Sequence, residues 1–325
     1  MSKSVFALLG LGIAAALAGI SQPAAAQVSQ VKFGCTGSAS SHYVYCTTIA
    51  REIAKRSAGQ NWTVIASGGV RDNFDLLNKG EIKIGVGAPD ALLQFEARKP
   101  PYQDSGNNNY RLLWIFTIAP QNIVVRADSG INALTDLNGK NFIAGARGTV
   151  TEVVFKDMLS TLGITPNYES GSYEDAAAAM QDRRVVGFGK ASPGLYPDAV
   201  FLRLQTSIKI RALPFPPEAV TKIRAGTPEN LFGEIPAKTV MPDQPAFTTW
   251  VVPLSIIAHK DYPEQQAYEA VKAAMEARND IFKVYPGILE DQAKATIQYN
   301  LGKMHPGAIR YFEEKGLKVP PEQKG

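Results

Sequence analysis

The residues best suited to chemistry lie in four short stretches, each between an apolar run and a helical pattern. Their side chains are hydroxyls, amides and cations, which donate hydrogen bonds, and a helix that begins nearby leaves backbone N–H groups free. Together such groups hold an anion, because an arginine fork matches a carboxylate. The candidate ligand-binding residues are Thr36, Ser38, Ser41 and Tyr43 in the first stretch, Arg71 and Asn73 in the second, Arg147, Thr149 and Thr151 in the third, and Lys190 and Ser192 in the fourth.

Each of these side chains also has a more ordinary use. A hydroxyl before a helix is more often a cap than a ligand contact, although one residue can serve as both. Arginine and lysine are usually solvated. The presence of Arg71, Arg147 and Lys190 in three of the four stretches nevertheless favours a small anionic ligand.

The pattern argues against catalysis. The three histidines, His42, His259 and His305, lie far apart, and no His/Cys group has metal-ligand spacing. No nucleophile elbow surrounds Ser38 or Ser192. A base within reach of its proton and oriented by a third group is not evident. We therefore expect reversible binding without an enzyme activity, a metal or a cofactor, with an exported enzyme as the alternative.

The elements that must position these stretches alternate between strands and helices. Such a series predicts an α/β fold with doubly wound, mostly parallel sheets. The expected strands are 31–34, 62–66, 82–86, 111–118, 123–125, 141–144, 167–168, 185–188, 208–213 and 247–258; the expected helices are 42–57, 70–78, 91–98, 134–137, 150–162, 175–181, 195–204, 219–225, 262–282, 289–299 and 306–315. Residues 189–194 are expected to form a loop, and 214–245 is rich in proline.

The central segment carries the strongest resemblance to a known family. It reads Val124-Val-Arg-Ala-Asp-Ser-Gly-Ile131, then Leu134-Thr-Asp-Leu-Asn-Gly-Lys140, then Gly145-Ala-Arg-Gly-Thr149. This order resembles the lobe-crossing segment of type II periplasmic solute-binding proteins, and most closely the TAXI family of TRAP-transporter binding proteins. Ser67-Gly-Gly-Val-Arg-Asp-Asn73 and the C-terminal run from His305 to Gly316 also resemble that family.

The resemblance has local departures. Ala39 and Ser40 stand where the family usually has glycine, and the third loop reads Gly87-Ala-Pro-Asp90 instead of ending in Gln/Ser-Asp. The likeness covers most of 31–215, weakens through 216–246 and returns towards the C-terminus.

The resemblance implies a two-lobe type II periplasmic binding protein fold with a hinge of two crossing strands. Lobe one is expected to comprise 27–122 plus 248–325, and lobe two 123–247. The implied function is capture of an organic acid or amino acid for the membrane subunits of a TRAP transporter. A ligand-sensing subunit of a signalling system would have the same fold and is the alternative.

The N-terminus predicts export. Lys3 precedes an apolar run from Val5 to Ile20, and Ala24-Ala-Ala26 offers a cleavage site, so residues 1–26 read as a signal peptide cleaved after Ala26. The alternative is a membrane anchor. The mature protein is expected in the periplasm as a monomer. The net charge of +4 is small and its charges are mixed, which argues against nucleic acid.

The two cysteines, Cys35 and Cys46, bracket the first candidate stretch. An exported compartment permits a disulfide, but whether their Cα atoms approach closely enough is not encoded in the spacing. The sequence leaves a bridge and two buried thiols as alternatives.

Overall fold

The computed structural model describes residues 28–38, 40–57, 59–99, 102–147 and 149–325. The signal peptide expected over residues 1–26 lies outside these ranges. None of the helices in the described ranges has the length and apolarity to cross a membrane.

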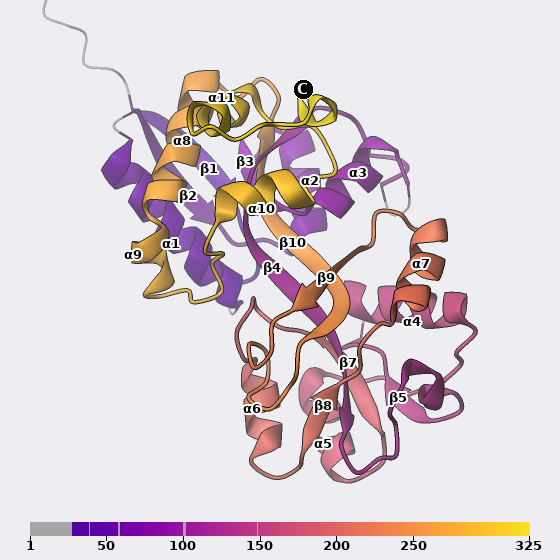
Figure 1. Ribbon diagram of the computed structural model, residues 1–325. Coiled ribbons are helices and arrows are strands. Elements are labelled where there is room, and N and C mark those ends of the chain that lie inside the picture. The colour runs from indigo at the N-terminus through magenta and orange to yellow at the C-terminus, as the bar shows by residue number, and fades with distance from the viewer. Residues whose placement is uncertain (1–27, 39, 58, 100–101, 148) are drawn as a thin grey trace, which may run out of the picture.

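The elements divide between the two bodies visible in Figure 1. The upper body contains β1 (Ser29–Gly34), α1 (Ser41–Arg56), β2 (Gln60–Ile65), α2 (Val70–Asn78), β3 (Ile84–Gly87), α3 (Pro89–Glu96), α8 (Glu264–Glu276), α9 (Arg278–Phe282), α10 (Gln292–Tyr299), α11 (Pro306–Glu314) and a 3-10 helix, η2 (Pro321–Gln323). The lower body contains a 3-10 helix, η1 (Leu134–Leu137), β5 (Asn141–Ile143), α4 (Val150–Leu162), β6 (Asn167–Tyr168), α5 (Tyr173–Gln181), β7 (Gly187–Ala191), α6 (Ala199–Gln205), β8 (Ile210–Ala212), α7 (Pro217–Gly226) and β9 (Leu231–Ile235).

Two long strands connect these bodies, β4 (Tyr110–Arg126) and β10 (Phe247–His259) (Figure 1). Within the described residues the strands form one continuous ten-stranded sheet, ordered β2-β1-β3-β10-β4-β7-β5-β6, with β8 beside β4 and β9 beside β10. The sheet is continuous because β4 pairs antiparallel with β10 up to Gln121 and then with β7 and β8. The mixed α/β architecture and the two crossing strands confirm the expected fold class.

Each body has apolar clusters on both faces of its part of the sheet. In the upper body, Phe33 and Trp114 belong to the cluster under α1, α8 and α11, and Phe74 lies in the cluster under α2 and α3. In the lower body, Phe188 and Phe155 belong to opposite clusters. Because each body buries its own side chains, each has the core of a lobe.

Several expected boundaries were wrong. The expected strands 111–118 and 123–125 are parts of one strand, β4, since burial and strand pairing continue through the polar residues Gln121 and Asn122. β7 extends to Ala191 and takes in residues expected to form a loop. β9 was missed in the proline-rich stretch, and the single helix expected over 262–282 breaks at Ala277 into α8 and α9.

Candidate functional site

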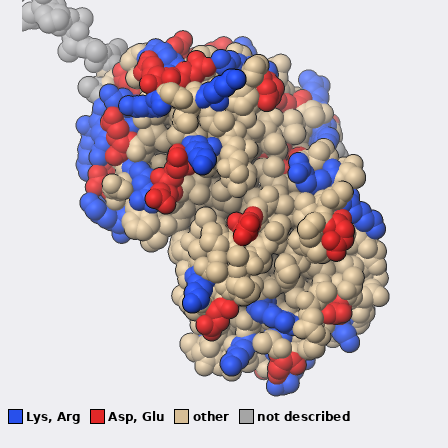
Figure 2. Space-filling model, in the orientation of Figure 1, with Lys and Arg blue, Asp and Glu red and all other residues tan. Residues whose placement is uncertain are grey.

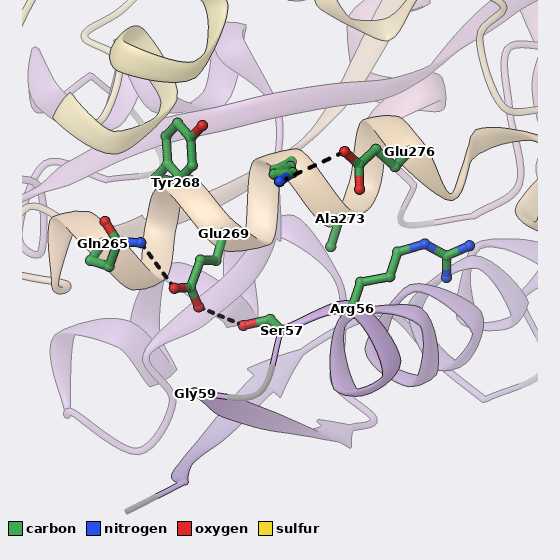
Figure 3. Close-up of a pocket in the computed structure, with 9 residues that line it drawn as sticks. Arg56, Ser57, Gly59, Gln265, Tyr268, Glu269, Ala273 and Glu276 are labelled. Atoms are coloured by element: carbon green, nitrogen blue, oxygen red, sulfur yellow. Dashed lines mark hydrogen bonds and ion pairs between the residues drawn. The ribbon is translucent and has the colours of Figure 1, made fainter. Parts of the chain in front are cut away.

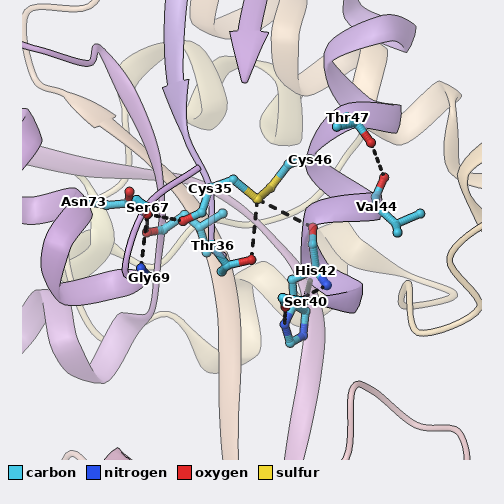
Figure 4. The surroundings of a disulfide bond; sticks show 11 residues. Cys35, Thr36, Ser40, His42, Val44, Cys46, Thr47, Ser67, Gly69 and Asn73 are labelled. Carbon is cyan, nitrogen blue, oxygen red and sulfur yellow. Dashed lines mark hydrogen bonds between the residues drawn. A yellow bond between two sulfur atoms is a disulfide. The ribbon is translucent and has the colours of Figure 1, made fainter. Parts of the chain in front are cut away.

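The first candidate stretch joins β1 to the N-terminus of α1 and is closed by a disulfide. Cys35 follows β1, Cys46 lies in α1, and their Cα atoms are 6.2 Å apart across the bond (Figure 4). The structure thus selects the bridge from the two alternatives for these cysteines. Ser40 caps α1, accepting a hydrogen bond from the backbone N–H of His42 at 3.2 Å.

The predicted ligand residues of this stretch differ in environment. Thr36 is half-buried, Ser38 is exposed, and Tyr43 is half-buried with its ring against the apolar cluster of the upper body. Ser41 begins α1, but its side chain lies outside the described part of the structure. The stretch therefore offers a ligand hydroxyl groups and the first turn of α1. The Tyr43 ring packs at one side of it.

Asn73 is used by the fold. Its Nδ2 donates to the carbonyl oxygens of Cys35 and Val86, both at 2.8 Å, and its side chain is fully buried (Figure 4). These bonds tie the end of β1 to the end of β3. Both amide hydrogens are therefore committed, and only Oδ1 lacks a partner among the described residues.

Arg71 differs from its neighbour. It lies in the first turn of α2, is exposed, and forms no ion pair with any residue that the structure describes. The Gly69 N-cap of this helix has φ 102°, a conformation that favours glycine. The helix begins without a side-chain cap on its N–H groups, and its first turn also contains Asp72, whose carboxylate accepts from the backbone N–H of Gly68 at 2.8 Å.

The third stretch joins β5 to α4 in the lower body. Thr149 caps α4 by accepting from the backbone N–H of Glu152 at 3.2 Å. Arg147 is exposed, and its Nε donates to Ser170 Oγ at 3.0 Å. Thr151 is buried and donates to Gln121 Oε1 at 2.9 Å. Thr149 thus has the ordinary role of a cap, and among the described residues Ser170 is the one side chain that accepts a hydrogen bond from the Arg147 guanidinium.

The fourth stretch does not supply a free cation. Lys190 Nζ lies 2.6 Å from Asp198 Oδ2, with 13% and 10% of the two side chains exposed. Its charge is also close to the rings of Tyr173 and Phe201. Sequence reasoning counted Lys190 among three cations, but a partner eight residues along the chain already neutralises it.

Ser192 belongs to a polar group that the sequence analysis missed. It is fully buried and accepts from Asn122 Nδ2 at 3.0 Å. Asn122 and Gln121 lie in β4, and Gln121 also accepts, through its backbone oxygen, from Thr249 of β10. Polar residues in the middle of an otherwise apolar strand were the available signal. They bind the two crossing strands to β7 and α4 where the bodies meet.

A second contact between the bodies involves the loop after β7. Tyr285 OH donates to Pro193 O at 2.7 Å. A Cβ on Gly194 would lie 2.7 Å from the Cα of Gly287, so the two backbones touch. His42 is half-buried nearby, and desolvation of its imidazole lowers its pKa to about 4. The imidazole is therefore neutral near pH 7 and adds no positive charge for an anion.

A pocket on the outside of the upper body is not part of this arrangement. It lies between α1 and α8, and its polar side chains bond to each other: Glu269 accepts from Ser57 and Gln265, and Lys272 pairs with Glu276 (Figure 3). Figure 2 shows both signs of charge mixed over the upper body and, between the bodies, a broad surface with few charged side chains, one of them acidic. No group of three or more His, Cys, Asp or Glu residues able to hold a metal occurs within the described ranges.

The chain matches one known protein family over most of its length. The model of one protein family, described as NMT1-like, matches residues 33–316. The chain belongs to the NMT1-like family. No curated protein matches this NMT1-like chain.

Solved structures show which fold this family member has. A TctC solute-binding protein from Polaromonas has a TM-score of 0.54 at 13% identity, covering 89% of this chain and 99% of that one. The Xanthomonas citri protein XAC2383, bound to ATP, has a TM-score of 0.51 at 10% identity, covering 88% and 98%. The extracellular-binding protein YtmK of Bacillus subtilis has a TM-score of 0.50 at 14% identity, covering 82% and 99%. The fold is that of two-lobe solute-binding proteins.

Proposed function

We propose that this chain is the extracytoplasmic solute-binding subunit of a TAXI-type TRAP transporter and captures a small organic acid or amino acid between two lobes. The observation that supports it is a matched pair of exposed arginines, one in each body. Arg71 lies in the first turn of α2, and Arg147 lies just before α4. Neither forms an ion pair with any side chain in the described ranges, in contrast to Lys190.

An anion suits this pair of arginines for a physical reason. Each arginine lies at the N-terminal end of a helix, where backbone N–H groups and the helix dipole favour negative charge. A ligand with an acidic group contacted from both lobes would favour the closed arrangement over the open one, because only the closed form offers both contacts. Binding would then present a changed surface to the membrane subunits. Sensing in a signalling system would use the same ligand-driven closure.

The proposal includes the lobe limits and the setting. Lobe one is residues 27–122 plus 248–325, and lobe two is 123–247. β4 and β10 form the hinge between them. The signal peptide is removed after Ala26, and the mature protein works as a periplasmic monomer. The proposed role is binding without catalysis; His42, the histidine near the candidate loops, has a pKa lowered to about 4, which makes it a weak base.

The test begins with ligand discovery. The purified mature protein is screened by thermal shift against dicarboxylates, keto acids, amino acids and aromatic acids, because a ligand that binds only the native state raises its stability. Calorimetry with the hit is then repeated on Arg71→Ala and Arg147→Ala. Each variant should lose about 1.5–3 kcal/mol of binding free energy, the range for a charge-assisted hydrogen bond.

The matched control is Arg224→Ala, which removes an exposed arginine from the last turn of α7. Its affinity should equal that of the unaltered protein. Unchanged affinity in both Arg71→Ala and Arg147→Ala would contradict the anion site. Recovery of the ligand in a chemically altered form would replace the binding role with an enzymatic one.

A further inference from the structure

Two loops from different bodies meet beside the crossing strand β4. The loop after β7 belongs to the lower body and contains Pro193 and Gly194, while the turn after α9 belongs to the upper body and contains Tyr285 and Gly287. Tyr285 is 1% exposed, and its hydroxyl donates to the Pro193 carbonyl oxygen at 2.7 Å. These four residues form the interlobe dock.

The backbones in the interlobe dock approach too closely for any side chain to fit between them. A Cβ on Gly194 would lie 2.7 Å from the Cα of Gly287 and 2.9 Å from its carbonyl oxygen. A Cβ on Gly287 would lie 2.7 Å from the Tyr196 ring and 2.9 Å from the Pro193 carbonyl oxygen. Neither glycine has a positive φ. Their backbone conformations therefore do not require glycine, whereas the contact between the two bodies does.

Both sides of the interlobe dock are fastened to β4. Thr117 Oγ1 donates to the Gly287 carbonyl oxygen at 2.6 Å, which fixes the turn of the upper body. The backbone N–H of Ser192 donates to the Pro120 carbonyl oxygen at 2.8 Å, which fixes the start of the lower loop. Thr117 and Pro120 lie within roughly 10 Å of each other along the strand. The dock therefore lies next to the part of β4 that passes from one body to the other.

The interlobe dock also adjoins the first candidate stretch. The centre of the Tyr285 ring lies 6.1 Å from that of the His42 imidazole and 5.6 Å from that of the Tyr45 ring, and both neighbours belong to α1. The ring of Tyr196, in the lower body, meets Tyr285 edge-on at 6.5 Å. Tyr285 thus connects the N-terminal part of α1 with the loop of the lower body. A change in the dock would therefore act on the end of α1 at which an anion is expected.

We propose that the interlobe dock holds the two lobes together in the ligand-free protein and so sets how readily they separate. The inference rests on the proposed function, because closure of these lobes is the step that captures the ligand. Opening breaks the hydrogen bond from Tyr285 to Pro193 and separates the backbones of Gly194 and Gly287. Both contacts form between protein groups alone, so the dock changes affinity without selecting which anion binds.

Two substitutions weaken the dock in different ways. Tyr285→Phe keeps the ring and removes the donor, so the ratio of closed to open lobes should fall roughly fivefold, the equivalent of one hydrogen bond. Gly194→Ala places a Cβ against the backbone of Gly287, and because both loops are fastened to β4, the lobes must move apart to accommodate it. Its effect should exceed that of Tyr285→Phe. The apparent affinity for a ligand falls with the closed fraction.

The experiment measures the distance between the lobes of the ligand-free mature protein by pulsed dipolar electron spin resonance. Nitroxide labels are attached to cysteines introduced at two exposed positions, Lys283 at the end of α9 and Arg203 in α6. The native cysteines are bridged and do not take up label. With the native dock the labels should give one narrow distance distribution. Gly194→Ala should add a population at longer distances, and Tyr285→Phe a smaller one.

Gly226→Ala is the matched control, because a Cβ on this glycine of α7 would meet nothing within 4 Å, and it should keep the narrow distribution. A distribution that already includes long distances with the native dock would overturn the proposal. An unchanged distribution in Gly194→Ala would also overturn it, as would one in Tyr285→Phe if Gly194→Ala does not fold by circular dichroism. Because no ligand is added, these results stand whether or not the anion site is confirmed.

Discussion

Each body contains a strand that leads into a candidate ligand-binding helix. The upper strand–helix unit is β1 with α1 and the lower one is β5 with α4, and different bonds join the strand to the helix in each. In the upper body, β1 and α1 are joined by the Cys35–Cys46 disulfide, and Asn73 fastens the end of β1 to β3. In the lower body, β5 leads into α4 through a stretch held by the Thr149 cap and a few hydrogen bonds. A disulfide and buried side-chain hydrogen bonds thus fix the upper unit, whereas local hydrogen bonds fix the lower one.

The first turns of the two helices differ in charge as well. The first turn of α1 contains no acid, whereas that of α4 contains Glu152, whose carboxylate pairs with Lys156 at 2.6 Å. An acid at this position competes with an incoming anion for the helix N-terminus. In the proposed anion site, the lower unit would therefore rely more on Arg147, and the upper unit more on the backbone N–H groups of α1.

The largest expected effect comes from removing the brace. The double variant Cys35→Ala/Cys46→Ala should lose about 3 kcal/mol of unfolding free energy, since the bridge closes a short loop. Urea unfolding measures the loss. Hydrogen exchange should accelerate in α1 with little change in α4, and equal acceleration in both helices would break the contrast between the units.

A smaller loss is expected at Asn73. Asn73→Ala removes two buried hydrogen bonds, but the Cys35 carbonyl keeps Ser67 Oγ as a donor at 2.8 Å. The Val86 carbonyl loses its Asn73 donor, which should cost about 2 kcal/mol in urea unfolding. Asn61→Ala, at an exposed position of β2, is the control and should change stability little. Equal unfolding free energies for the two variants would show that the Asn73 hydrogen bonds do not stabilise the upper body.

The smallest effect is expected at the cap of the lower unit. Thr149→Ala removes the acceptor for the Glu152 N–H and should cost about 1 kcal/mol. The exposed Thr221 of α7 offers the control, Thr221→Ala. Faster exchange confined to the first turn of α4 would sharpen the comparison. A loss of unfolding free energy as large as that of the disulfide variant would mean that Thr149 stabilises the lower unit by more than its capping hydrogen bond.

The sequence predicted the elements well wherever local signals agreed. The bounds of α2 and α4 match the expected 70–78 and 150–162, because glycine or a capping threonine precedes an apolar period and a turn glycine follows. β9 was missed because its central Gly233 and the surrounding prolines obscure a strand that exists through pairing with β10. A strand that forms by pairing with a segment distant in the sequence is only weakly indicated by its own residues.

The site was less predictable than the fold. Residue types correctly indicated helix N-termini with hydroxyls and cations, but not which groups were already engaged. Lys190 forms an ion pair with Asp198, and Asn73 donates both of its amide hydrogens to backbone oxygens. Each partner is fixed by tertiary structure.

The position of β10 also determines the order in which this protein can fold. In the finished sheet it lies between β3 and β4, where Gly87 pairs with Ser255 and Ile118 with Pro253. During synthesis or export from the N-terminus, the upper body lacks this central strand until nearly the whole chain has emerged. The lower body, whose own segments are contiguous, can assemble first. The first strands and helices of the upper body then stay incomplete until β10 has been made.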